Sequence, residues 1–235
     1  MSIEHIELNR GTSAQLFKLP QQMIDYLWEC IDVAKKKKIN VKKDLAGYIS
    51  HSYKLEDSQN LVAENLFNII FNEKDNPKMF NFIKEELESI FKKTCPDQNK
   101  KVVAKPHLSS LWVNFQKKGE FQPLHNHSGL FSFVIWMDIP YDWKDEAKLP
   151  FVRPNNKIPP GGNFSFVFSN GNCRQVHERT ISMSPEMNGY CCFFPSDLCH
   201  QVYPFYTSDK ERISISGNIT FKENVVDAPF IVSNT

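Results

Sequence analysis

The sequence predicts a mainly β protein with α-helices, a sandwich or a barrel preceded by a helical layer. In the first hundred of its 235 residues, apolar side chains recur at steps of three and four, which is typical of helices. After Pro96, short runs rich in Val, Ile, Phe and Trp alternate with Pro, Gly and Asn, which is typical of short strands. We therefore expect residues 1–100 to form a mainly helical layer on a β domain of residues 101–235, together one compact unit.

Three helices are expected in the N-terminal layer. The apolar face of the first consists of Ile24, Leu27, Ile31 and Ala34. Ser58 can cap a second helix. Asn76 followed by Pro77 predicts the start of a third, because proline is favoured at the first helical position.

Five apolar runs are expected to be strands: residues 108–115, 130–139, 163–168, 190–194 and 212–221. The segment 140–162 is rich in Pro and has few apolar residues, so we expect a long loop. Loops of that length in compact domains are often functional lids.

Composition excludes several functions. The formal net charge of +1 gives no indication of nucleic-acid or anionic-membrane partners. No apolar stretch reaches the roughly 18 residues of a membrane helix, and no secretory signal is visible. We therefore expect a cytoplasmic protein with reduced cysteines. The sequence does not indicate an oligomeric state. The cysteines are Cys30, Cys95, Cys173, Cys191, Cys192 and Cys199.

The strongest local feature is the pair His125 and His127, at the beginning of an apolar run. Residues i and i+2 of a strand project to one side, so both imidazoles can aim at one point. His200 follows a later apolar run and a Pro turn. Two close ligands and one distant ligand are how a barrel assembles a metal site with open positions. Imidazoles suit Fe, Zn, Cu and Ni, and unrelated polar histidines are the alternative.

Arg212 and Ser214 alternate with Ile213 and Ile215, which gives the last strand one polar face. An arginine inside a barrel needs an anion, because a buried unpaired charge is costly. A guanidinium beside a hydroxyl suits a carboxylate ligand. A structural salt bridge or an outward polar stripe would explain the same pattern.

The order of these motifs resembles the 2-oxoglutarate/Fe(II) oxygenase superfamily, over residues 108–221. There a His-x-Asp or His-x-Glu motif is followed by a distal His and then by Arg-x-Ser. The neighbouring sequence is similar to an uncharacterised branch of this superfamily that is common in bacteria and marine bacteriophages. The residues that carry the resemblance are Gly119, His125, His127, Pro195, His200, Arg212 and Ser214, with Trp112-Val-Asn-Phe and Ser132-Phe-Val-Ile as flanks.

The resemblance implies a double-stranded β-helix (jelly roll) that binds Fe(II) and uses 2-oxoglutarate and O₂ to oxidise a substrate of unknown class. His125 and His200 would bind the iron. His127 stands where the superfamily usually has a carboxylate. Either it is a third ligand or the iron keeps an extra open position, and a neutral ligand leaves the site one unit more positive.

The resemblance also implies roles in binding the cosubstrate. Arg212 would pair with the distal carboxylate of 2-oxoglutarate, and Ser214 would add a hydrogen bond. Asn114 lies where relatives place a polar cosubstrate contact, and Ser132 is a second candidate of that kind.

Two other functions compete with this interpretation. Gly119-x5-His125-x-His127 also matches the start of the cupin metal motif, so a three-His cupin dioxygenase that does not use 2-oxoglutarate is the first alternative. The Glu of that cupin motif is missing after His127, and Arg212 has no role in it. The second alternative is a non-catalytic jelly-roll binding protein. Binding of 2-oxoglutarate separates the oxygenase from both.

Overall fold

The computed structural model describes residues 3–9, 12–72, 74, 76–94, 101–152, 161–169 and 175–226. The chain divides into two compact units. The first, here the barrel unit, consists of Met1–Glu56 and Ser110–Asn218. The second, here the helical unit, consists of Asp57–Ser109 and Ile219–Thr235. Every residue predicted for the functional site lies in the barrel unit.

The strands β4 to β11 form a jelly roll, in which the chain folds back on itself as one long hairpin. Strand β7 pairs with β8, β6 with β9, and β5 with β10, all antiparallel, and β4 lies beside β11. This nesting of first with last strand defines a double-stranded β-helix and confirms the predicted fold class. The bounds are β4 Lys101–Gln116, β5 Gln122–His125, β6 Phe131–Asp138, β7 Phe164–Ser169, β8 Val176–Ile181, β9 Tyr190–Pro195, β10 His200–Val202 and β11 Arg212–Val226.

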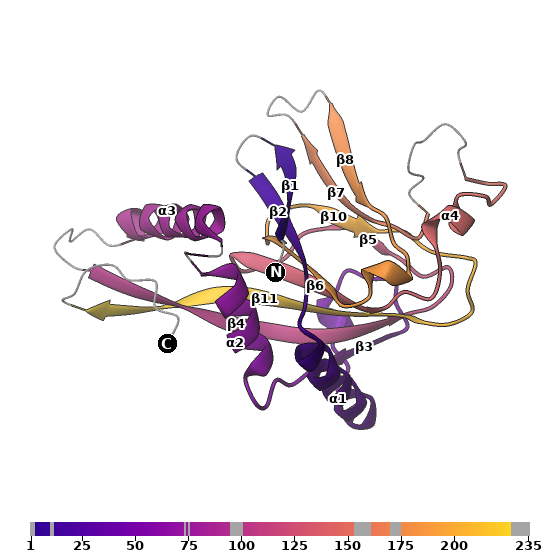
Figure 1. Ribbon diagram of the computed structural model, residues 1–235, viewed down its shortest axis with the longest axis horizontal. Helices are drawn as coiled ribbons and strands as arrows, with labels where there is room; N and C mark the ends of the chain where they lie inside the picture. The colour runs from indigo at the N-terminus through magenta and orange to yellow at the C-terminus, as the bar shows by residue number, and fades with distance from the viewer. Residues whose placement is uncertain are drawn as a thin grey trace. The chain divides into compact units, whose positions relative to one another are not determined.

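The strands lie in two sheets, one of order β1-β2-β9-β6-β11-β4-β3 and one of order β5-β10-β7-β8 (Figure 1). Strands β1 (Ile3–Asn9), β2 (Thr12–Lys18) and β3 (His51–Lys54) extend the larger sheet. The expectation of a mainly helical segment over residues 1–100 does not include the strands β1, β2 and β3. The apolar residues of β1 and β2 alternate with period two, and these two strands bury Ile6, Leu8, Ala14 and Leu16 in the core with Trp136, Phe166 and Phe194.

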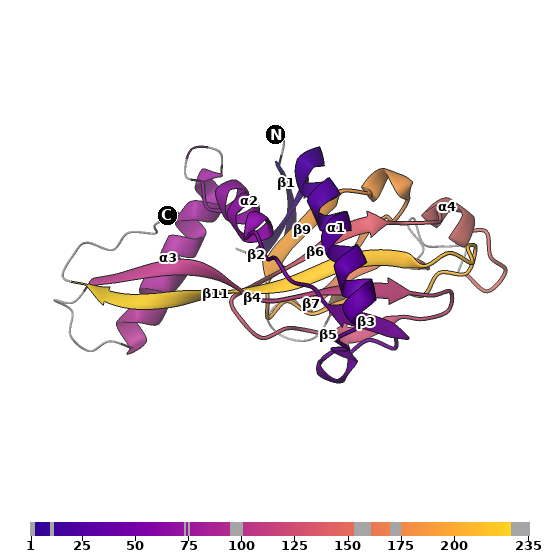
Figure 2. The same ribbon diagram turned by 90° about the horizontal axis from the view of Figure 1, so that it is seen from below.

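Helix α1 (Gln21–Lys37) confirms the first predicted helix. It covers the face of the larger sheet that is turned away from the smaller sheet (Figures 1 and 2). Its buried residues are Met23, Tyr26, Leu27, Cys30, Ile31 and Ala34. The smaller helical turns of the barrel unit are η1 (Lys42–Asp44), α4 (Trp143–Glu146) and η2 (Pro185–Met187). Helix α4 lies in the segment predicted as a loop, and residues 153–160 of that segment are outside the described residues.

The helical unit contains α2 (Leu61–Ile70) and α3 (Pro77–Thr94). Pro77 begins α3 as predicted, and Met79, Ile83 and Leu87 are buried. The predicted cap of α2 is wrong. The helix begins after Asn60, whose φ is 56° and whose own side chain forms no cap hydrogen bond. Oδ2 of Asp57 accepts from the N–H of Ala63 in the first turn at 3.0 Å.

Two further expectations concern membranes and cysteines. Within the described residues, no helix has the length and hydropathy needed to cross a bilayer. The cysteines of this part of the chain, Cys30, Cys191, Cys192 and Cys199, are all free, in agreement with reduced thiols. Cys95 and Cys173 lie outside the described residues.

Candidate metal and cosubstrate site

A β-bulge in β5 turns two side chains into the barrel. His200 of β10 pairs with His125, and Val202 pairs with Gln122, so β5 has one more residue than β10 between the two pairs. An extra residue breaks the strict alternation of side chains. His125 therefore faces His200 while Gln122, three residues earlier, lines the pocket between the sheets.

His125, His127 and His200 come together as the sequence predicts. Their potential ligand nitrogens all lie within 4.8 Å of one another. The ring centroids are 4.3 Å apart for His125 and His200, 5.0 Å for His127 and His200, and 5.1 Å for His125 and His127. Nitrogens bound to one ion at about 2.1 Å would be about 3–3.5 Å apart. Small ring movements are enough to reach that geometry.

Hydrogen bonds fix the tautomer of all three rings. The Nδ1 of His125 lies 2.7 Å from the Pro123 carbonyl oxygen, and the Nδ1 of His200 lies 2.9 Å from the Leu198 carbonyl oxygen. The Nδ1 of His127 lies 2.9 Å from Oδ1 of Asn218. Because each partner is an acceptor, each Nδ1 carries the proton. Each Nε2 then keeps its lone pair for a metal, as metal-binding histidines require.

Burial keeps these imidazoles neutral. It lowers the pKa of His125 and of His127, and it lowers the pKa of His200 to about 3. The neighbouring histidines lower the pKa of His127 and His200 further, because each additional positive charge would repel the others. A cluster of three neutral imidazoles is ready to bind a metal without first losing protons.

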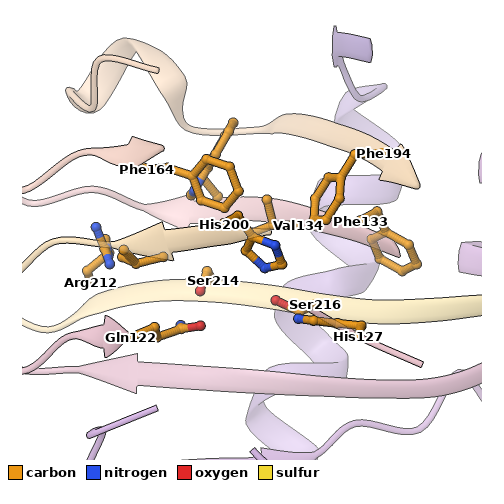
Figure 3. A pocket seen from close by; sticks show the side chains of 12 residues that line it. Gln122, His127, Phe133, Val134, Phe164, Phe194, His200, Arg212, Ser214 and Ser216 are labelled. Carbon is orange, nitrogen blue, oxygen red and sulfur yellow. The ribbon is translucent and has the colours of Figure 1, made fainter. Parts of the chain in front are cut away.

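The pocket beside the cluster has a polar row and an apolar wall (Figure 3). Arg212, Ser214 and Ser216 follow one another along β11 towards His127, at alternate positions of the strand. Gln122 lies opposite this row. The apolar wall consists of Phe133, Val134, Trp136, Phe164, Phe194 and Val202. Phe164 stacks on His200 at 5.4 Å, which shields the cluster on that side.

Arg212 is 3% exposed, yet no carboxylate of the described residues lies within salt-bridge distance of it. Its Nη1 donates to the Tyr141 hydroxyl at 2.7 Å and to the Gly162 carbonyl at 3.0 Å, and its Nη2 donates to Oε1 of Gln116. Three of its five N–H bonds are thus used on neutral acceptors. A buried positive charge with only neutral partners is costly, and an anion bound beside it would offset that cost.

The segment after β6 is tied to this arginine. The Tyr141 hydroxyl also donates to the Gly162 carbonyl, so Tyr141, Gly162 and Arg212 form one cluster. The carboxylate of Glu146, fully buried, accepts hydrogen bonds from the backbone N–H groups of Tyr206 and Thr207. These bonds join the segment to the loop before β11.

Comparison with known proteins identifies the family. Residues 110–218 match the family described as "Putative 2OG-Fe(II) oxygenase", a stretch that contains the three histidines, Arg212 and Ser214. The jelly-roll core is similar to the 2-oxoglutarate/Fe(II) oxygenase superfamily over this stretch. The chain is therefore an oxygenase whose cofactor is Fe(II) and whose cosubstrates are 2-oxoglutarate and O₂. No curated protein matches the sequence.

The chain is similar to several solved structures, among them two prolyl hydroxylases and one 2OG-Fe(II) oxygenase-family protein. A Pseudomonas putida prolyl-4-hydroxylase has a TM-score of 0.48 at 14% identity, over 88% of this chain and 92% of its own. A Trichoplax adhaerens prolyl hydroxylase, in complex with a hypoxia-inducible factor peptide, has a TM-score of 0.43 at 10% identity, over 88% and 82%. A Burkholderia pseudomallei 2OG-Fe(II) oxygenase-family protein has a TM-score of 0.36 at 12% identity, over 93% and 72%.

The residues present fit the iron of this oxygenase superfamily. The donor set is three unprotonated imidazole nitrogens that converge from β5, the residues after β5, and β10. Imidazole is a ligand that iron accepts, and neither thiolate nor carboxylate belongs to the cluster. One side of the cluster opens on the polar row of the pocket, where a cosubstrate can complete the coordination.

Two residues predicted to contact the cosubstrate of the oxygenase, Asn114 and Ser132, are buried outside the lining of the pocket. Asn114 is buried on β4, and its Oδ1 accepts a hydrogen bond from Ser52 at 2.7 Å. Ser132 is 0% exposed, and its hydroxyl bonds to Ser196 and Asn218 instead of facing the pocket. Neither residue is among those that line the pocket, so their contact with the cosubstrate stays a prediction.

Sequence reasoning missed four polar residues of the oxygenase site. Ser216 and Asn218 continue the alternation that begins at Arg212, so extending that pattern would have found them. Gln116 likewise continues the alternation from Asn114 on β4. Gln122 had no sequence signal, because a bulge, and not the period of a regular strand, turns it inward.

Proposed function

We propose that this oxygenase binds one Fe(II) through His125, His127 and His200, and holds 2-oxoglutarate between that iron and Arg212. The observation that supports it most directly is the buried Arg212, which has no carboxylate partner among the described residues and faces the pocket that leads to the three histidines. The strand positions from Arg212 to Ser216 span about 13 Å, which leaves room for a five-carbon diacid between guanidinium and metal.

The remaining polar groups of the pocket suit the same ligand. No described residue forms a hydrogen bond with the side chain of Gln122, Ser214 or Ser216, although all three line the pocket. Polar groups that face a secluded cavity need a partner. Ser214 follows Arg212 on the strand and would donate to the same carboxylate, while Ser216 lies beside His127 and Gln122 lies across from Ser214. The apolar wall would contact the methylene groups of the cosubstrate.

In the proposed reaction, Fe(II) with 2-oxoglutarate would activate O₂, placing one oxygen atom in the substrate and the other in succinate, with release of CO₂. The protein's own part is to hold and orient. Arg212 neutralises the distal carboxylate, and the histidines keep three coordination positions occupied. Phe164 and Phe194 keep water away from His200, at ring distances of 5.4 and 4.9 Å.

We also propose a reducing, cytoplasmic location. Cys191 and Cys192 are adjacent, fully buried and free, and burial raises the pKa of both thiols, so neither is set up for disulfide chemistry. This supports the expectation of a cytoplasmic enzyme.

The test is binding followed by turnover. Iron-loaded protein is titrated anaerobically with 2-oxoglutarate by calorimetry, and succinate formation is then measured with candidate substrates. We expect one molecule of 2-oxoglutarate per chain and slow uncoupled succinate formation without substrate. Iron binding without any 2-oxoglutarate binding would overturn the proposal and favour a three-His dioxygenase of the cupin type.

A further inference from the structure

We propose that Asn218 is a positioning residue that makes His127 a permanent third ligand of the iron, supported by Ser132 and Ser196. This inference rests on the proposed function, and it addresses what replaces the carboxylate that the superfamily usually has at position 127. Asn218 comes from β11, the strand that also carries Arg212.

The hydrogen bonds at Asn218 determine which nitrogen of His127 faces the metal. Oδ1 of Asn218 accepts from the Ser132 hydroxyl at 2.9 Å and lies 2.9 Å from Nδ1 of His127. Two donors thus converge on one amide oxygen. The proton of His127 is held on Nδ1, and Nε2 is left as the metal-binding atom.

The backbone of His127 is fixed by the same cluster. Its N–H donates to the Ser196 carbonyl at 2.8 Å, and the N–H of Ser196 donates to Leu130 at 3.0 Å. The hydroxyls of Ser132 and Ser196 lie 2.9 Å apart, and both serines are 0% exposed. Both the ring and the main chain of His127 are therefore connected to one buried pair of serines.

The other two histidines are oriented differently. His125 and His200 use the carbonyl oxygen two residues before them, an acceptor that any sequence supplies. His127 uses a side chain 91 residues away in sequence, on another strand. A carboxylate at this position would need the amide NH2 group of Asn218, whereas the orientation observed presents Oδ1 to the ring. This orientation of Asn218 matches an imidazole ligand.

Charge supports the same assignment. Asparagine is neutral, so this ligand and its partner add no negative charge to the site. An Asn218→Asp substitution would keep the hydrogen-bond acceptor and add a negative charge. A carboxylate in this position should raise the basicity of the His127 ring and so should not weaken metal binding. Asn218→Leu keeps the approximate volume and removes the acceptor. The two variants separate orientation of the ring from the packing of residue 218.

The experiment measures anaerobic Fe(II) affinity by competition with a coloured chelator. Loss of an outer hydrogen-bond partner usually weakens metal binding by about 10–100-fold, so Asn218→Leu should lose about that factor while Asn218→Asp should not. In a His127→Ala background, Asn218→Leu should cause no further loss, because the two residues act as one unit. The visible absorption of the Co(II)-loaded protein should change in His127→Ala and in Asn218→Leu alike.

Ser165→Ala is the matched control, since Ser165 is a buried serine of β7 whose hydroxyl lies 2.9 Å from that of Thr180. It should leave Fe(II) affinity unchanged, and thermal unfolding of each variant checks that it folds. Native-like affinity of Asn218→Leu, or an equal loss with and without His127, would overturn the inference. Unchanged metal binding in His125→Ala and His200→Ala would instead overturn the proposed iron site itself.

Discussion

Removing the guanidinium of Arg212 should weaken 2-oxoglutarate binding far more than it weakens iron binding. The side chain is 3% exposed, and two of its five N–H bonds have no partner among the described residues. A charge-assisted contact contributes about 1.5–3 kcal/mol. Arg212→Ala should therefore raise the Kd of 2-oxoglutarate by about ten- to over a hundredfold.

A lysine at this position should recover only part of the loss. It keeps the charge but not the planar fork that also reaches Gln116, Tyr141 and Gly162. Both substitutions remove the guanidinium donor of the buried Gln116 Oε1, whereas the Gly162 carbonyl keeps the Tyr141 hydroxyl as a donor, so we also expect each variant to be less stable by about 1–3 kcal/mol. Chemical unfolding measures this cost separately from binding.

Anaerobic calorimetry on iron-loaded protein gives the Kd directly, and metal analysis shows that iron is retained. Arg179, exposed on β8, provides the matched control, because Arg179→Ala removes an arginine that does not line the pocket. Equal 2-oxoglutarate affinity in native protein and in Arg212→Ala would refute the reasoning, as would an equal loss in Arg179→Ala.

Three further outcomes are expected. His125→Ala and His200→Ala should each lose bound iron, and unchanged metal content in both by elemental analysis would contradict the ligand assignment. Gln122→Leu should weaken 2-oxoglutarate binding by about fivefold in calorimetry, the value of one hydrogen bond of about 1 kcal/mol; native affinity would show that Gln122 does not contact the cosubstrate. Gly162→Ala should destabilise the protein by about 1–3 kcal/mol in chemical unfolding, because φ is +72° and the added Cβ would lie 2.7 Å from the Tyr141 ring. Unchanged stability would contradict both the backbone strain and the close contact with Tyr141.

Five of the eight barrel strands, β4 to β11, were predictable because each is an apolar run between turn residues, whereas the short or polar strands β5, β8 and β10 were not predicted. All five predicted runs lie largely within β4, β6, β7, β9 and β11. Strands β1 and β2 were not predicted, since their short apolar alternation is mixed with charged and polar residues. Their place at the edge of the larger sheet depends on pairing with β9. Pairing between distant strands is not visible in local periodicity.

The metal ligands and Arg212 were predictable because their spacing follows strand geometry and a known motif order. Tyr141 and Glu146 were not. The sequence around Glu146 has the charge pattern of a solvated helical turn, yet the carboxylate is fully buried. Only the fold brings it to the backbone of Tyr206 and Thr207. Contacts of this kind join segments that are 60 residues apart, so no local pattern carries them.

The charges of the pocket explain why a dianion fits this site. With three neutral imidazoles, an iron(II) ion keeps both of its positive charges, and Arg212 adds a third at the other end of the polar row. Two unit charges about 5 Å apart interact by about 3 kcal/mol at an effective dielectric constant of 20. A ligand with one carboxylate would leave one end of the row without a partner, whereas a five-carbon diacid satisfies both. With His127 in place of the usual carboxylate, the proposed ligand set would add no negative charge to the metal, and the carboxylates of the cosubstrate would supply that charge.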